Sequence, residues 1–174
     1  MKILNFGSLN IDRVYRVAHL VRAGETISSL GYQCFPGGKG LNQSIAAARA
    51  GQKVYHAGCI GADGGFLLDT LQEGGVDTRY VRNTGGITGH ALIQVDDGGE
   101  NCIILYPGSN CENEEAYVDQ VLSDFEGPDI LLLQNEINDL EMLLKKGKER
   151  GMRIMLNPSP MDEALKRMDL SAVT

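Results

Sequence analysis

Residues 35–51, FPGGKGLNQSIAAARAG, place three glycines around Lys39 directly before an alanine-rich run. Glycines let a backbone approach a bound molecule closely, and the first turn of a helix offers unpaired N–H groups. Together with the positive charge of Lys39, these groups suit a ligand rich in oxygen atoms. A glycine-rich turn with a solvated lysine explains the same composition equally well, so the segment alone is only a candidate site.

The segment lacks both common nucleotide motifs. A P-loop requires serine or threonine after Gly-Lys, but Gly38-Lys39 is followed by Gly40, and Gln33 stands where the first glycine belongs. The order strand, Gly-x-Gly-x-x-Gly of dinucleotide-binding folds is also absent. This glycine pattern therefore does not predict a cradle for nucleotide phosphates.

Polar side chains follow three predicted strands at their carboxyl ends: Asn10 and Asp12, Asn135 and Glu136, and Asn157. Asn10 and Asp12 point to the same side if this stretch is extended, because side chains alternate along a strand. Taken singly, each residue is also typical of a turn. Because ligands of parallel α/β sheets bind beyond the carboxyl ends of the strands, the group predicts a pocket rich in hydrogen-bond acceptors.

The charges in this group restrict the ligand. An anion suits Lys39 but is repelled by Asp12 and Glu136 in a partly dry pocket. A neutral polyol resolves the conflict, because its hydroxyls donate to carboxylates and accept from amides and lysine. Each such charge-assisted bond contributes about 1.5–3 kcal/mol, so a site of this kind rejects analogues that lack a hydroxyl.

Composition excludes several classes of protein. The formal net charge of -7 argues against nucleic-acid binding, and no apolar run is long enough to span a bilayer. We expect no signal peptide in MKILNFGSLN, which is short and polar. The four cysteines lie far apart without a Cys-x-x-Cys pair, and the three histidines are scattered. We therefore expect reduced thiols, a cytoplasmic location and no metal site.

Alternating strands and helices provide the frame for these side chains. Strands are predicted at residues 2–7, 53–61, 129–134 and 152–160, and helices at 41–50, 62–75, 114–125 and 138–150. We expect Asp63 to cap the second helix, and Asn138 with Glu141 to form a capping box on the fourth. This order, in 174 residues that are 43% hydrophobic, predicts a single α/β domain with a parallel sheet.

Two β-rich stretches interrupt this alternation. The runs at 13–21 and 23–35 combine β-branched and aromatic residues with polar ones, and 89–108 reads as a hairpin around Asp97-Gly98-Gly99. They predict an additional small sheet.

Several segments together resemble a known family. The stretches GSLNID, GETI, PGGKGLNQSIAAARAG, GCIGADGGFLLDTLQEGGVDT and LLLQNEI, in this order, resemble the PfkB family of carbohydrate kinases, and in particular its ribokinases. The resemblance covers essentially the whole chain. It implies a ribokinase-like three-layer α/β/α core with a small β-sheet lid, built from segments near 13–35 and 90–106. Residues 1–174 would then be the N-terminal part of a single ribokinase-like domain, truncated at the C-terminal side.

The resemblance also implies an activity and a set of site residues. The activity is transfer of the γ-phosphate of ATP, with Mg2+, to a sugar hydroxyl, most closely that of D-ribose, in a homodimer joined through the lids. By position, the sugar-binding residues are Asn10, Asp12, Gly38, Lys39, Gly40, Asn42 and Glu136. Asn10, Asp12, Lys39 and Glu136 had already stood out on chemical grounds.

One departure limits this expectation. The catalytic aspartate of the family lies in a Gly-Ala-Gly-Asp motif, preceded by an Asn-x-x-Glu stretch that serves magnesium and the phosphates, and neither occurs here. No catalytic or metal residue is therefore assigned in this chain, and the ATP-binding residues are expected mostly outside it. Three alternatives stay open: a non-catalytic sugar-binding or dimerising fragment, a kinase for another sugar such as fructose, and a fragment that does not fold alone.

Overall fold

The computed structural model describes all 174 residues and contains a central sheet of five parallel strands in the order β5-β4-β1-β8-β9. The strands are β1 (Ile3–Phe6), β4 (Val54–Ile60), β5 (Asp77–Asn83), β8 (Ile130–Gln134) and β9 (Arg153–Asn157). The central ones are almost entirely apolar, because a parallel sheet is covered on both faces.

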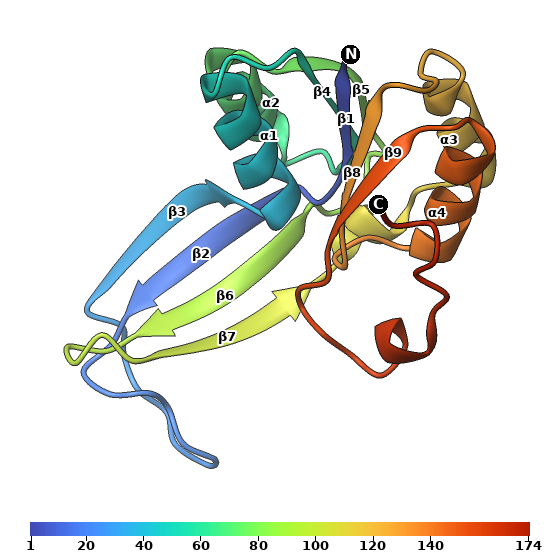
Figure 1. The fold of residues 1–174 in the computed structure, drawn as a ribbon. Coiled ribbons are helices and arrows are strands. Elements are labelled where there is room, and N and C mark those ends of the chain that lie inside the picture. The colour runs from blue at the N-terminus through green and yellow to red at the C-terminus, as the bar shows by residue number, and fades with distance from the viewer.

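Two pairs of helices cover the two faces of this sheet (Figure 1). They are α1 (Lys39–Arg49) and α2 (Gly65–Glu73) on one face, and α3 (Glu115–Leu122) and α4 (Leu140–Glu149) on the other. Each pair has its own apolar cluster, the larger beneath α3 and α4 and the smaller beneath α1 and α2. Short 3-10 helices lie at Gly108–Cys111 and Leu165–Arg167. The three-layer α/β/α expectation is confirmed.

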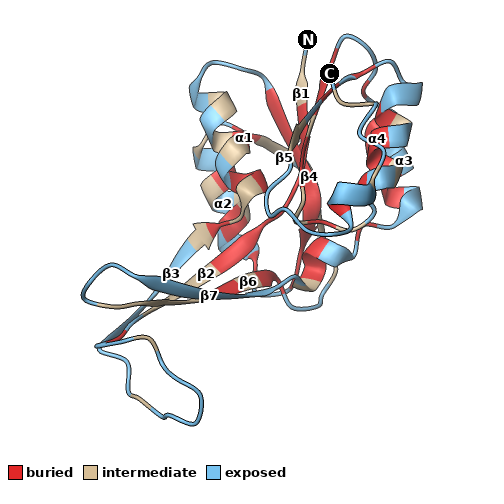
Figure 2. Cartoon of the chain, turned by 60° about the horizontal axis from the view of Figure 1, so that its bottom comes forward, coloured by how far each residue is buried: buried red, intermediate tan, exposed pale blue.

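A second sheet of four strands projects from one end of the core (Figure 1). Its order is β3 (Gly31–Gly37), β2 (Asn10–Arg16), β6 (Gly89–Val95) and β7 (Asn101–Tyr106), with β2 and β6 parallel and the outer pairs antiparallel. Much of it is exposed (Figure 2). Asp12 lies opposite Phe35 and Ala91, so the predicted small sheet exists and Asn10 and Asp12 share one of its faces.

Some local predictions were wrong. The strand expected at 13–21 ends at Arg16, and the one expected at 23–35 begins only at Gly31, because residues 17–30 form a loop that Val17 N–H and Val21 N–H attach to β6. Strand β5 was not predicted, since DTRYVRN carries many polar residues. Because β5 is an edge strand of the main sheet, its polar side chains remain partly exposed.

The two predicted helix caps were also wrong. Helix α2 begins after Gly64, and Asp63 Oδ1 accepts a hydrogen bond from Thr88 N at 2.9 Å instead. Helix α4 begins after Asp139, while Asn138 Oδ1 accepts from Asn113 N and Nδ2 at 3.1 and 3.0 Å. In both cases a donor distant in the sequence occupies the oxygen that a cap would need.

A buried polar network connects α1 to the main sheet. Asn5 Nδ2 donates to Gly40 O and to Ser44 Oγ at 2.7 and 2.8 Å, and Gln134 Nε2 donates to Asn5 Oδ1 at 2.9 Å. His56 lies 2.8 Å from Ser44 Oγ through Nδ1 and 3.2 Å from Gly7 O through Nε2. Because a carbonyl only accepts, Nε2 carries the proton and Nδ1 accepts from Ser44. The neutral ring satisfies both partners.

Burial lowers the pKa of His56 from 6.5 to about 4, although the bond to Gly7 O opposes this shift. Between these two values the unfolded chain binds a proton that the folded chain does not. The stability of the protein is therefore expected to fall as the pH drops through this window, by about 2 kcal/mol at pH 5.

Urea unfolding between pH 7.5 and 5 measures this loss. The variant His56→Gln is expected to be less stable than wild type at pH 7.5 but to lose less stability on acidification. An identical pH dependence in His56→Gln and wild type would assign the loss to other groups.

Candidate functional site

Glu136 joins three elements at the carboxyl end of the main sheet. It follows β8, and its Oε2 accepts from Ser8 Oγ at 2.5 Å and from Lys39 N at 3.0 Å. Its Oε1 pairs with Lys39 Nζ at 2.7 Å. The Glu136 side chain is only 9% exposed, so this ion pair is shielded from water on the carboxylate side. Glu136 thus holds the start of α1 against the segment that follows β1.

The first N–H groups of α1 are all used within the protein. Lys39 N donates to Glu136, Gly40 N to Ser8 Oγ at 3.2 Å, and Leu41 N to Ser8 O at 3.0 Å. Asn42 N donates to Gly38 O at 3.1 Å. Because these groups have partners and Glu136 neutralises Lys39, this helix start is not an open site for a phosphate.

The glycines of this loop permit close approach between backbones. A Cβ on Gly40 would lie 2.6 Å from the carbonyl carbon of Gly7 and 2.7 Å from Ser8 O. Gly38 has a φ of 96°, a conformation that side-chain-bearing residues rarely adopt. Both glycines are therefore required for the helix start to rest on the end of β1, whatever further contact they make with a ligand.

Asp12 is the carboxylate of this region that the protein leaves unpaired. It extends from β2 over Gly37, whose added Cβ would lie 2.5 Å from Asp12 Oδ1, and no protein group donates a hydrogen bond to its side chain. Burial raises the pKa of Asp12, the nearby charge of Glu136 raises it further, and Lys39 lowers it. A desolvated acceptor without a donor is suited to hydroxyl groups of a ligand.

A cavity of about 120 Å³ lies between the two sheets. It is lined by Asn10, Leu105, Tyr106, Pro107, Asn110, Asn135, Glu136 and Pro160. It brings together Asn10 and Glu136, which 126 positions separate in the sequence. It also includes Asn110, which sequence reasoning missed; the signal was a polar residue soon after a predicted strand, the same signal that selected Asn10.

Among the predicted residues, Asn10, Asn135 and Glu136 line this cavity, whereas Asp12, Gly38, Lys39, Gly40, Asn42 and Asn157 do not. The Asn42 side chain is exposed and forms no hydrogen bond, and Asn157 Oδ1 accepts from Ser159 N at 3.1 Å within a turn. Asn135 does line it and donates to Pro160 O at 2.7 Å.

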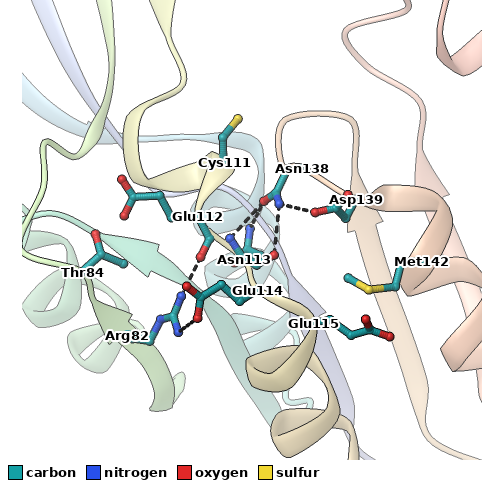
Figure 3. Close-up of a pocket in the computed structure, with 10 residues that line it drawn as sticks. All are labelled: Arg82, Thr84, Cys111, Glu112, Asn113, Glu114, Glu115, Asn138, Asp139 and Met142. Carbon is teal, nitrogen blue, oxygen red and sulfur yellow. Dashed lines mark hydrogen bonds and ion pairs between the residues drawn. The ribbon is translucent and has the colours of Figure 1, made fainter.

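The largest cavity, about 790 Å³, lies elsewhere, beside the starts of α3 and α4 (Figure 3). Arg82 in its wall pairs with Glu114 at 3.0 Å, and none of the predicted site residues lines it. No three His, Cys, Asp or Glu side chains of the chain gather as a candidate metal site. No helix has both the length and the apolar character needed to cross a membrane.

Comparison with known proteins identifies the family of the chain. Residues 1–171 match the pfkB family carbohydrate kinases. The chain belongs to this family. It is 36% identical over 173 residues to a ribokinase of Haemophilus influenzae, across 94% of this chain and 56% of that protein.

Solved structures show the same relationship. The ribokinase of Cryptococcus neoformans in complex with ADP has a TM-score of 0.83 at 34% identity, over 99% of this chain and 55% of that one. The Arabidopsis thaliana ribokinase complexed with ribose and ATP has a TM-score of 0.78 at 30% identity, over 92% and 54%. The chain therefore spans little more than half the length of the relatives that it matches.

The contacts of Gly40 lead to a paired test of the loop. Gly40→Ala is expected to lower the free energy of unfolding by about 1–3 kcal/mol, because the new Cβ forces α1 away from Gly7 and Ser8. Gly65→Ala in α2 meets no atom within 4 Å and is expected to change stability by less than about 1 kcal/mol. Denaturant unfolding of both variants measures the difference, and equal effects would contradict the tight contact.

Proposed function

We propose that this chain is the sugar-binding half of an ATP-dependent carbohydrate kinase of the ribokinase type, which converts D-ribose to ribose 5-phosphate. The observation that carries the proposal is the half-buried carboxylate of Asp12, which has no hydrogen-bond donor within the protein, together with Asn10 and the Lys39–Glu136 pair. Membership of the pfkB family supports it. In this proposal Asn10, Asp12, Gly38, Lys39, Gly40, Asn42 and Glu136 surround the sugar.

The chemistry of these groups assigns them positioning roles. Asp12 accepts hydrogen bonds from sugar hydroxyls, which replace the water that burial has removed, and Asn10 donates to a hydroxyl oxygen. The Lys39–Glu136 pair fixes the loop that carries Gly38 and Gly40. Holding the acceptor hydroxyl in a fixed place is a large part of phosphoryl transfer, in which the protein supplies mainly orientation and charge stabilisation.

The proposed activity uses ATP and Mg2+, but their binding is not assigned to the residues of the sugar site. The chain has no carboxylate cluster for Mg2+, and the helix start in its glycine-lysine loop has no free N–H groups for phosphates. We derive no catalytic step from this chain and assign it no catalytic residue.

We extend the proposal to the second sheet. It acts as a lid over the sugar and as the contact between two copies in a homodimer. Strand β7 supports this role, because Ile103, Ile104, Leu105 and Tyr106 are each about half exposed in one continuous run. The four cysteines form no disulfide, as suits the cytoplasmic location that we propose.

Asp12→Asn tests the sugar site. The variant is expected to lose at least about tenfold in affinity for D-ribose, because charge-assisted hydrogen bonds contribute about 1.5–3 kcal/mol each. Its thermal stability is expected to stay equal or rise, since a desolvated carboxylate becomes neutral.

Calorimetric titration with D-ribose, together with a thermal melt, measures both effects. Asp97→Asn, at the exposed turn of the same sheet, is the matched control and is expected to bind like wild type. Unchanged ribose affinity in Asp12→Asn would remove Asp12 from the site, and tighter binding of fructose by wild type would change the assigned sugar.

A second measurement separates binding from catalysis. With ATP, Mg2+ and D-ribose, the purified 174-residue chain is expected to release no ADP in a sugar-dependent manner, because it lacks the Gly-Ala-Gly-Asp motif. Ribose binding without turnover would support a sugar-binding half, and the alternative of a non-catalytic sugar-binding fragment predicts the same. Ribose-dependent ADP formation by this chain would show that our assignment of residues is incomplete.

A further inference from the structure

Asn110 has a buried side-chain amide that is hydrogen-bonded to the side chain of Asn10. It lies in the 3-10 helix after β7 and is 2% exposed. Its Oδ1 accepts from Leu9 N at 2.9 Å, and its Nδ2 donates to Asn10 Oδ1 at 2.7 Å. The two asparagines are 100 positions apart in the sequence, so only the fold brings them together.

These two bonds fix the orientation of both amides. A backbone N–H only donates, so the oxygen of Asn110 must face Leu9 and its NH2 group must face Asn10. Asn10 is then obliged to turn its oxygen towards Asn110. Its NH2 group makes no hydrogen bond within the protein, and Asn10 lines the cavity between the sheets. Asn10 therefore offers N–H donors to a ligand rather than an oxygen.

The surroundings hold Asn110 in place. Asn113 Nδ2 donates to Asn110 O at 2.9 Å, and Asn113 and Asn138 exchange hydrogen bonds (Figure 3). Gly89 leaves the space for the asparagine pair, since a Cβ there would overlap Asn110 Nδ2 and lie 2.5 Å from Asn10 Oδ1. This packing leaves little freedom for either amide to rotate.

We propose that Asn110 is a positioning residue that sets the polarity of the ligand site, by making Asn10 a donor next to the acceptor Asp12. Asn10 and Asp12 lie on the same face of β2. The matching ligand group is a hydroxyl, or two adjacent hydroxyls, that donates to Asp12 and accepts from Asn10. A deoxy ligand, with hydrogen in place of this hydroxyl, or a ligand with an ammonium group there, offers no lone pair to the NH2 group of Asn10. The inference rests on the proposed sugar-binding function and adds a rule of specificity to it.

Polarity matters because a hydroxyl has one proton. If Asp12 receives that proton, the hydroxyl oxygen is left with lone pairs, which only a donor can use. An Asn10 that turned its oxygen to the cavity would face the hydroxyl as a second acceptor, and one bond would be lost. The cost of a lost bond of this kind corresponds to about tenfold in affinity.

The first experiment needs no variant. Hydrogen exchange of side-chain amides, followed by NMR on the 15N-labelled chain without sugar, is expected to show slow exchange for the NH2 group of Asn110 and fast exchange for that of Asn10. Equal exchange, or the reverse order, overturns the proposed orientation, and this test does not depend on sugar binding.

The second experiment inverts the polarity with Asn110→Asp. A carboxylate at this position still accepts from Leu9 N but no longer donates to Asn10. The Asn10 amide is therefore expected to rotate so that its NH2 group donates to the new carboxylate. We expect slow exchange of the Asn10 amide without sugar and about tenfold weaker binding of D-ribose. Asn138→Asp adds the same charge nearby, keeps the hydrogen bonds that Asn113 N and Nδ2 donate to this side chain, and touches neither the Asn110 side chain nor Asn10. It is the matched control and is expected to show neither change.

The outcomes separate the two proposals. If wild type does not bind D-ribose, the sugar-binding function fails, while the exchange pattern still decides the orientation of Asn10. If wild type binds and Asn110→Asp binds equally well with a folded spectrum, Asn110 does not set the polarity. A loss in Asn138→Asp as large as in Asn110→Asp would assign the effect to the added charge and overturn the positioning role.

Discussion

The arrangement of the site depends on one side chain, Glu136. Its two oxygens take a hydroxyl, a backbone N–H and an ammonium group, from Ser8 and Lys39. A largely buried carboxylate is tolerated only when it is paired and hydrogen-bonded, and here the partners come from the ends of β1 and the start of α1. The burial of Glu136 is therefore compensated only when the ends of β1 and β8 and the start of α1 are held in these positions.

This interaction also decides what the loop does not do. The glycine-lysine segment has the composition of an anion site, yet its N–H groups and its lysine are already engaged. The groups left for a ligand are the carboxylate of Asp12 and the NH2 group of Asn10 on the neighbouring sheet. A free acceptor beside a free donor suits a neutral, hydroxyl-rich molecule better than a phosphate.

Stability and recognition are divided between two polar groups of residues. The network of Asn5, Ser44, His56 and Gln134 satisfies most of its hydrogen-bonding groups inside the protein and ties α1 to the sheet. Asp12 pays a desolvation penalty without a partner. A fully paired network adds rigidity, whereas the half-buried carboxylate of Asp12 remains available to a ligand with the right donors.

The sequence by itself determined the layers and the main candidates of the site. Apolar strands alternating with helices predicted the parallel core, Asp97-Gly98-Gly99 located the hairpin, and strand alternation placed Asn10 and Asp12 on one face. These features depend on near neighbours in the chain, whose preferences can be read locally. They did not reveal the edge strand β5, because its polar composition hides its pairing.

Only the tertiary structure decided which polar groups are occupied. Asn138 and Asp63 looked like helix caps, but distant donors at Asn113 and Thr88 take their oxygens. Lys39 looked free, and its partner Glu136 lies 97 positions away. A hydrogen bond satisfies a group equally well from a near or a distant residue, so composition identifies polar candidates while the fold selects those left for a ligand.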